Sequence, residues 1–168
     1  MRTRRSILGT GLFALFSTVL AHADTPAPAV HGPWLGVWKL NVEKSQFRTN
    51  KPPAGTVRLY TMRAASDDKF DVHIVSTSPE GVQTMNMETR GARFDGKPYR
   101  EIGNPFADAN TFRLINSRSY EFVETKNGKE VITISVEISE DGRTRTSRQK
   151  SIGADGQPSV NVAVWDRQ

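Results

Sequence analysis

The 168-residue sequence contains no cysteine. Disulfide bonds, a thiolate nucleophile and cysteine-ligated metal sites are therefore excluded. A domain without covalent cross-links depends on burial of its core, and a chain of this length can form one such core unaided. We expect a single domain.

Histidine is scarce as well, with three in the whole chain. The sequence has no Gly-x-Ser-x-Gly, no His-Glu-x-x-His and no clustered carboxylates, so no nucleophile-and-base pattern stands out. His73 shares a strand face with Asp71, which could orient its ring, but a half-exposed strand histidine is the preferred interpretation. We predict a non-catalytic protein with no metal site and no cofactor.

Long apolar runs are absent except at residues 7–20. Three arginines among the first five residues precede this run, and Ala21-His22-Ala23 follows it as a small-x-small cleavage site. The pattern predicts a signal peptide over residues 1–23, and hence a periplasmic or secreted protein. The run is too short to cross a bilayer, so we expect no transmembrane segment in the mature chain.

Two export routes fit this leader. Thr3-Arg4-Arg5-Ser6-Ile7-Leu8 is similar to a twin-arginine motif, which would mean export of a folded domain, although Gly9 replaces the usual lysine. An ordinary Sec peptide with two adjacent arginines fits as well.

The basic excess is small once the leader is removed. The leader contains three of the 23 basic residues and none of the 18 acidic ones, leaving 20 against 18 and a mature formal charge of +2. This balance argues against a nucleic-acid partner. Residues 24–33 then form a Pro/Ala-rich linker to a domain over residues 34–168.

Helical periodicity is absent beyond one possible turn, capped by Asn41, at Val42–Ser45. Most of the chain shows the apolar alternation of β-strands. The clearest case is Ile132, Ile134, Val136 and Ile138. Similar segments occur at 57–62, 70–75, 82–90, 112–114, 120–122, 143–150 and 160–164.

Turn dipeptides separate these segments. Asp95-Gly96, Asn127-Gly128, Asp141-Gly142 and Asp155-Gly156 tolerate the positive φ that hairpin turns require. The regular spacing of the last three favours sequential antiparallel strands. We predict an all-β fold, an antiparallel up-and-down barrel of about nine or ten strands.

Several motifs resemble those of small bacterial exported lipocalin-like proteins. They are Gly36-Val37-Trp38-Lys39-Leu40-Asn41, Gly96-Lys97-Pro98-Tyr99 and the ending Val164-Trp165-Asp166-Arg167-Gln168. The resemblance spans the mature chain and implies a calycin-type barrel that carries a small apolar molecule. It also implies that Gly36 and Trp38 close one end of the barrel, with Arg167 or Arg148 stacked on the indole.

A ligand cavity would be lined by large adaptable side chains. Tyr60, Met62, Met85 and Met87 are the candidates for its wall, since methionine fits varied apolar shapes. The same four residues could equally be ordinary core.

The most unusual segment is the basic run at 143–150, which places cations on both faces of one strand. One set must face the barrel interior, where an unpaired guanidinium is costly unless an anion accompanies it. Arg148, or the pair Arg143 and Arg145, is therefore a candidate anchor for a ligand carboxylate or phosphate. Salt bridges to Glu88, Glu124 or Glu137, or charges that blunt a strand edge, are the alternatives.

Together these features predict an exported, non-catalytic binding module for a small apolar or amphipathic molecule, anionic if an inward arginine anchors it, in a cavity of several hundred Å³. The alternative is a structural or interaction protein whose barrel is filled by its own side chains.

Overall fold

The structure, a computed structural model, describes residues 32–152 and 156–168. The expected signal peptide, and the linker up to residue 31, lie outside the described residues. Ten strands make up the described part, and no helix occurs in it. The strands are β1 (Gly36–Gln46), β2 (Val57–Ala64), β3 (Phe70–Thr77), β4 (Gln83–Ala92), β5 (Asp95–Ile102), β6 (Ala109–Asn116), β7 (Ser119–Lys126), β8 (Lys129–Ile138), β9 (Thr144–Ile152) and β10 (Pro158–Arg167).

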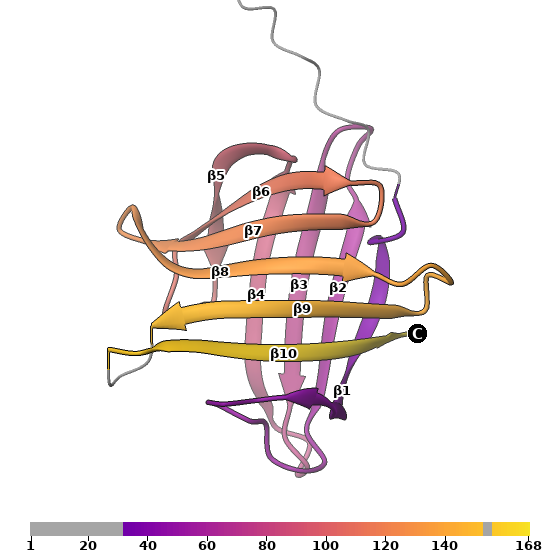
Figure 1. The fold of residues 1–168 in the computed structure, drawn as a ribbon, viewed down its shortest axis with the longest axis vertical. Coiled ribbons are helices and arrows are strands. Elements are labelled where there is room, and N and C mark those ends of the chain that lie inside the picture. Colours follow the sequence, from indigo (N-terminus) through magenta and orange to yellow (C-terminus); the bar gives the residue numbers. More distant parts are fainter. Residues whose placement is uncertain (1–31, 153–155) are drawn as a thin grey trace, which may run out of the picture.

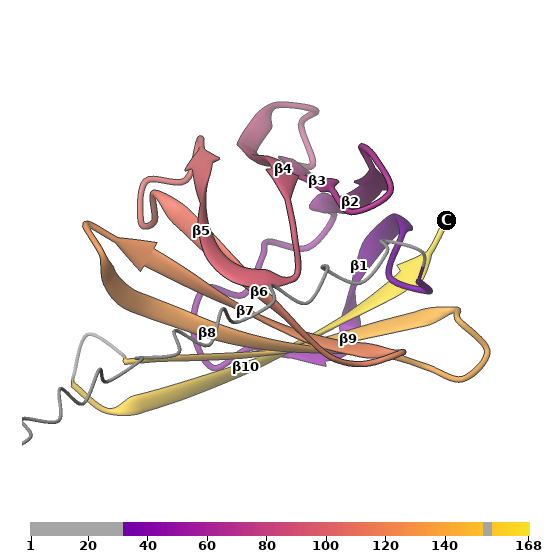
Figure 2. The ribbon, with the colours of Figure 1, turned by 90° about the horizontal axis from the view of Figure 1, so that it is seen from above.

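The strands form a closed antiparallel barrel in which each strand pairs with its neighbours in sequence, and β1 pairs with β10. The predicted all-β, up-and-down barrel is confirmed. Figure 1 shows β6 to β10 running across β2, β3 and β4, so that the wall folds back on itself around one interior. The view from above in Figure 2 shows the two parts of the wall enclosing that interior.

Turn residues account for the β7–β8 and β8–β9 hairpins. Asn127 and Gly128 both have positive φ, 50° and 74°, as a two-residue primed turn between β7 and β8 requires. Gly142 has a φ of 68° in the β8–β9 turn. Asp155 lies outside the described residues.

Two local predictions are wrong. Asp95-Gly96 does not form a turn: it begins β5, and the chain bends one step earlier, at Arg93-Phe94. The bend points Phe94 into the core, where its ring lies 4.7 Å from that of Phe70. The helical turn after Asn41 is instead an irregularity inside β1, in which the Lys44 amide donates to the Asn41 side chain at 3.0 Å.

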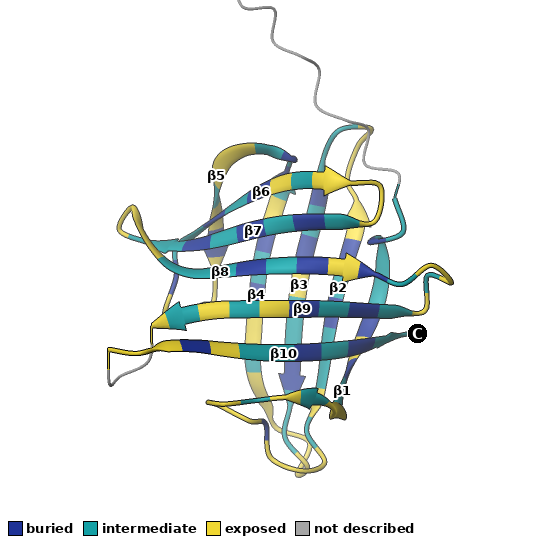
Figure 3. Ribbon diagram, in the orientation of Figure 1, coloured by how far each residue is buried: buried dark blue, intermediate teal, exposed yellow. Residues whose placement is uncertain are grey.

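The barrel interior is packed with rings. Figure 3 shows buried and exposed residues alternating along the strands, as a two-sided wall demands. Six rings form a continuous set of edge-on and stacked contacts, with centroids 4.7 to 6.2 Å apart. They belong to Trp34, Phe70, Phe94, Phe112, Tyr120 and Phe122.

The strand ends define two ends of the barrel. Trp38 lies at the end where β1 begins and β10 finishes, which we call the closed end. The opposite end, which we call the mouth, includes the segments 47–56, 78–82 and 103–108 that link strand pairs.

Arg167 seals the closed end against Trp38. Its guanidinium lies 4.2 Å from the centroid of the fully buried Trp38 ring and donates to the carbonyls of Pro33, Leu35 and Gly142. The Trp38 indole N–H in turn donates to the Trp34 carbonyl at 3.0 Å.

Gly36 makes this contact possible. A Cβ at Gly36 would lie 2.6 Å from Arg167 Nη1, and its φ of +133° disfavours any other residue. The structure therefore gives the Gly-x-Trp motif a physical reason: the glycine leaves space for the guanidinium that covers the tryptophan.

We predict that Arg167→Ala destabilises the barrel by about 2–4 kcal/mol, because three carbonyls lose their donor and the indole loses its cation. Urea unfolding followed by tryptophan fluorescence measures the change. The matched control is Arg113→Ala, which removes an exposed arginine of β6. We expect it to lower the free energy of unfolding by less than about 0.5 kcal/mol. Equal losses for the two variants would contradict this role.

Candidate functional site

The interior changes character from one end to the other. Aromatic and aliphatic side chains fill the closed end, whereas polar groups collect toward the mouth. Ser76, Thr89, Glu101, Asn110 and Glu124 are all buried there. Burying polar side chains costs free energy unless they find hydrogen-bond partners, so their concentration at one end makes the mouth the candidate site.

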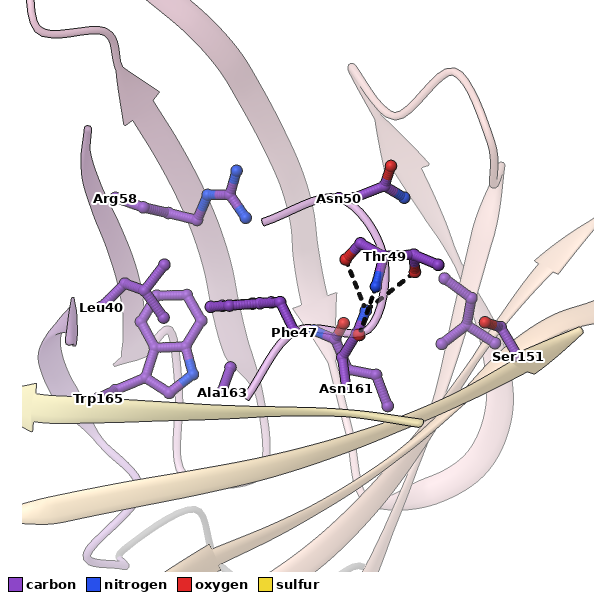
Figure 4. A pocket seen from close by; sticks show the side chains of 11 residues that line it. Leu40, Phe47, Thr49, Asn50, Arg58, Ser151, Asn161, Ala163 and Trp165 are labelled. Carbon is purple, nitrogen blue, oxygen red and sulfur yellow. Dashed lines mark hydrogen bonds between the residues drawn. The ribbon is translucent and has the colours of Figure 1, made fainter. Parts of the chain in front are cut away.

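A pocket with a cavity volume of about 120 Å³ lies at the mouth. Figure 4 shows Trp165, Leu40 and Ala163 on one side of it and Thr49, Asn161 and Ser151 on the other. The full lining is Leu40, Phe47, Thr49, Asn50, Arg58, Ile132, Gln149, Ser151, Asn161, Ala163 and Trp165.

Asn161 fastens the segment 47–50 over this pocket. Its Oδ1 accepts from the amides of Arg48 and Thr49, at 2.8 and 3.2 Å. Its Nδ2 donates to the Thr49 carbonyl at 3.3 Å. One side chain of β10 thus holds the connection between β1 and β2, as the dashed lines of Figure 4 show.

Arg58 brings a positive charge into the pocket from β2. The side chain is half-buried, and its Nε donates to Ser76 Oγ at 3.4 Å. Burial lowers the pKa of its guanidinium. Within the described part of the chain, Arg58 forms no ion pair with a carboxylate. A half-buried cation without an anion is poised to bind one.

The four predicted wall residues lie elsewhere in the interior. Tyr60, Met62 and Met87 are buried, and Met85 is half-buried on the same face as Met87. None of the four lines the pocket of Figure 4. Tyr60 shares a hydrogen bond of 3.2 Å with Tyr120 and packs edge-on against Trp165, so it belongs to the aromatic core.

In β9, which contains most of the basic run, Arg145 points into the barrel and Arg148 does not. Arg148 is exposed and lies beside a groove on the outer face of β6 to β9. Arg145 is 1% exposed, with its guanidinium carbon 4.0 Å from the Tyr60 ring centroid and Nη2 donating to Tyr120 at 3.2 Å. The anchor hypothesis offered Arg148, or the pair Arg143 and Arg145; of these three, Arg145 is buried, opposite Trp165 of β10, whereas Arg143 and Arg148 are exposed.

Two buried carboxylates form a second polar group, in which sequence reasoning identified Glu124 only as an alternative salt-bridge partner and missed Glu101. Glu101 of β5 and Glu124 of β7 are each 8% exposed. Asn104 Nδ2 donates to both, at 3.1 and 3.4 Å. A signal was available: Glu124 alternates with Tyr120 and Phe122, which places it on their inward face.

Burial shifts the proton affinity of both carboxyl groups. Desolvation raises the pKa of Glu101, against hydrogen bonds from Asn104 and Asn110. Desolvation, with repulsion from Glu101, raises the pKa of Glu124 to about 7. Glu124 therefore changes charge near neutral pH.

His73 lies outside this site. It is exposed, with Nε2 2.7 Å from Asn86 Oδ1. Asp71, its proposed partner, accepts from the Gly91 amide at 2.9 Å and pairs with Arg63.

We predict that the free energy of unfolding falls as pH rises, because Glu124 holds its proton more tightly in the folded state. Its folded pKa, about 7, exceeds its unfolded value near 4.5, so between these the folded state keeps a proton that the unfolded chain has lost. The free energy of unfolding should fall across this window by up to roughly 3 kcal/mol. Urea unfolding at several pH values measures it.

Glu124→Gln should flatten this fall, because glutamine stays neutral throughout. Glu130→Gln, an exposed carboxylate near the same end, is the matched control and should leave the slope unchanged. Parallel stability curves for wild type and Glu124→Gln would disprove the assignment.

No family model and no curated protein sequence matches this chain. Among solved structures, the fold is similar to that of a single-site variant of the fluorescent protein UnaG. The likeness has a TM-score of 0.51 and 16% sequence identity, and it covers 81% of this chain and 96% of UnaG. At this identity the likeness shows the fold alone, a closed antiparallel β-barrel.

Within the described residues, the structure contains no helix that is long and apolar enough to cross a membrane.

Proposed function

We propose that this protein binds a small amphipathic molecule at the mouth of its barrel. The acidic group of the ligand contacts Arg58, and its apolar part lies against Phe47, Leu40 and Trp165. The protein holds this molecule without transforming it.

The observation that carries the proposal is the Arg58 guanidinium, half-buried beside an apolar surface and without a carboxylate partner in the described part of the chain. A desolvated cation in such a place gains most from a bound anion, because charge-assisted hydrogen bonds strengthen away from water. The closed antiparallel barrel supports the proposal, since small barrels of this architecture can hold one small ligand.

Ligand size depends on the segment 47–50. The cavity of about 120 Å³ is smaller than the 300 Å³ or more of typical ligand sites. A larger ligand enters when this segment moves, which breaks its hydrogen bonds to Asn161. The Asn161 contacts therefore set the rate of entry and exit.

We predict that the anionic amphipathic dye 1-anilinonaphthalene-8-sulfonate binds the native protein, and that Arg58→Gln weakens binding about tenfold to a hundredfold. This range is the value of a hydrogen bond to a charged group. Fluorescence titration measures the affinity, and a thermal melt shows that the variant is folded.

Arg148→Ala provides the matched control for this titration, because it removes an exposed arginine from the outer face. It should bind the dye as the wild type does. If Arg148→Ala weakened binding and Arg58→Gln did not, the anchor would be on the outer face and the proposed site would be wrong.

A second function is favoured by the aromatic filling of the interior. A barrel filled by its own rings needs no ligand, and its role would then be structural or in contacts at its surface. Native mass spectrometry of protein purified from its own host distinguishes the two: retained small-molecule mass supports the binding module, and bare protein the self-filled barrel.

We further propose that the protein is exported. The charged, apolar and small-residue order of residues 1–23 supports this, as does the resemblance to small bacterial exported lipocalin-like proteins. N-terminal sequencing of the exported protein should begin at Asp24. Replacing Arg4 and Arg5 by lysine should block export on the twin-arginine route and spare it on the Sec route.

A further inference from the structure

Exposed apolar side chains gather at one end of the barrel. The described residues include seven large apolar side chains that are well exposed, and six of them lie at or near the mouth. These six are Val57, Val82, Ile102, Phe106, Ile152 and Val160. The seventh, Ile115, lies near the closed end, where the described turns between strands expose no large apolar side chain. The apolar exposure is therefore a property of the mouth rather than of strand ends in general.

The most exposed of these side chains, Phe106, stands on a well-anchored loop. It is 75% exposed, whereas its neighbour Ala107 is 1% exposed. Asn104 Oδ1 accepts from the Phe106 amide at 2.9 Å, and the Asp108 amide donates to the Thr125 carbonyl at 2.8 Å. The fold thus holds an aromatic ring out in water, which is unfavourable until another apolar surface covers it.

Unpaired cations surround these apolar side chains. We consider the links between strands at the mouth, together with the three strand residues next to each link. Within the described part, five exposed cations of this region form no ion pair. They are Arg48, Lys51, Arg100, Lys129 and Lys150. The exposed acidic residues described in the same region are Glu80 and Glu130, so positive charge is in excess.

The closed end treats its charges differently. Three of its arginines form ion pairs with carboxylates, at distances of 2.6 to 3.4 Å. The pairs are Arg63–Asp71, Arg93–Asp68 and Arg118–Glu140. The two ends therefore differ in two independent respects, since the mouth has both the apolar side chains and the uncompensated positive charge.

We propose that the mouth rim, meaning the six apolar and five basic residues above, docks on the surface of an anionic lipid bilayer. The cations lie against the anionic headgroups, and the apolar side chains enter the boundary between headgroups and acyl chains. A second copy of this chain fits the rim less well, because two rims of the same charge repel each other.

Docking turns the mouth toward the membrane, so a docked protein would take up an amphipathic ligand directly from the bilayer. The docking itself does not depend on Arg58 or on any ligand in its pocket.

Co-sedimentation with lipid vesicles tests the proposal. Protein purified from its own host is mixed with vesicles of phosphatidylcholine alone, or of phosphatidylcholine and phosphatidylglycerol in equal parts. We expect the protein to bind the anionic vesicles at low ionic strength and to bind the neutral ones far more weakly. Binding should be lost in about 0.5 M sodium chloride, because salt screens the attraction between exposed charges.

Substitutions at the two ends separate docking from general stickiness. Phe106→Ser should weaken binding to the anionic vesicles at least about tenfold, because the ring no longer leaves water. Lys150→Gln should weaken it about fivefold, the usual contribution of one basic residue near an anionic surface. Ile115→Ser and Arg143→Gln are the matched controls near the closed end and should bind as the wild type does. All four side chains are exposed, so the melting temperatures should not change.

No binding to the anionic vesicles, equal binding to both kinds of vesicle, or equal losses in Phe106→Ser and Ile115→Ser would each overturn the proposal. A dimer that forms without vesicles, and that Phe106→Ser converts to a monomer, would also overturn it, because the rim would then cover a second copy. The dye titration of Arg58→Gln uses no vesicles, so failure of the ligand pocket and failure of the docking surface are told apart.

Discussion

The stacking of Arg167 on Trp38 is the contact on which the barrel depends. It joins the first strand to the last, donates to three backbone carbonyls, and covers the largest buried ring at the closed end. Gly36 is required because a side chain there would displace the guanidinium. The pocket that we propose as the ligand site lies at the other end, the mouth.

Buried charge is distributed unevenly inside the barrel. Arg145 is satisfied in part by the Tyr60 ring and the Tyr120 hydroxyl, whereas Arg58 meets only Ser76. Glu101 and Glu124 share one amide. Opposite charges thus lie in the same interior without forming an ion pair in the described part. Buried charges without a partner of opposite sign lower the stability of the fold, and a bound partner would offset this cost.

The fold could be predicted from sequence because strand alternation and turn residues are local signals. Ile132 to Ile138 and Asn127-Gly128 behaved as their patterns indicate. The candidate site was harder to predict from the sequence. Cations alternate onto both faces of β9, so only the register with β10 decides that Arg145 points inward. The alternation at residues 57–62 does not distinguish Arg58 from any other strand arginine. Pairing Glu101 with Glu124 requires knowing that β5 and β7 flank β6.

The order of the strands also governs how this chain can fold. Arg167 donates a hydrogen bond to the Leu35 carbonyl, 132 residues earlier in the sequence. The contact between β1 and β10 therefore cannot form until β10 has been synthesised. Until then β1 and the growing sheet have free edges, and the inward aromatic faces are uncovered. Nascent chains are therefore exposed to aggregation for nearly the whole of synthesis, and a chaperone that shields strand edges would act before closure rather than after it.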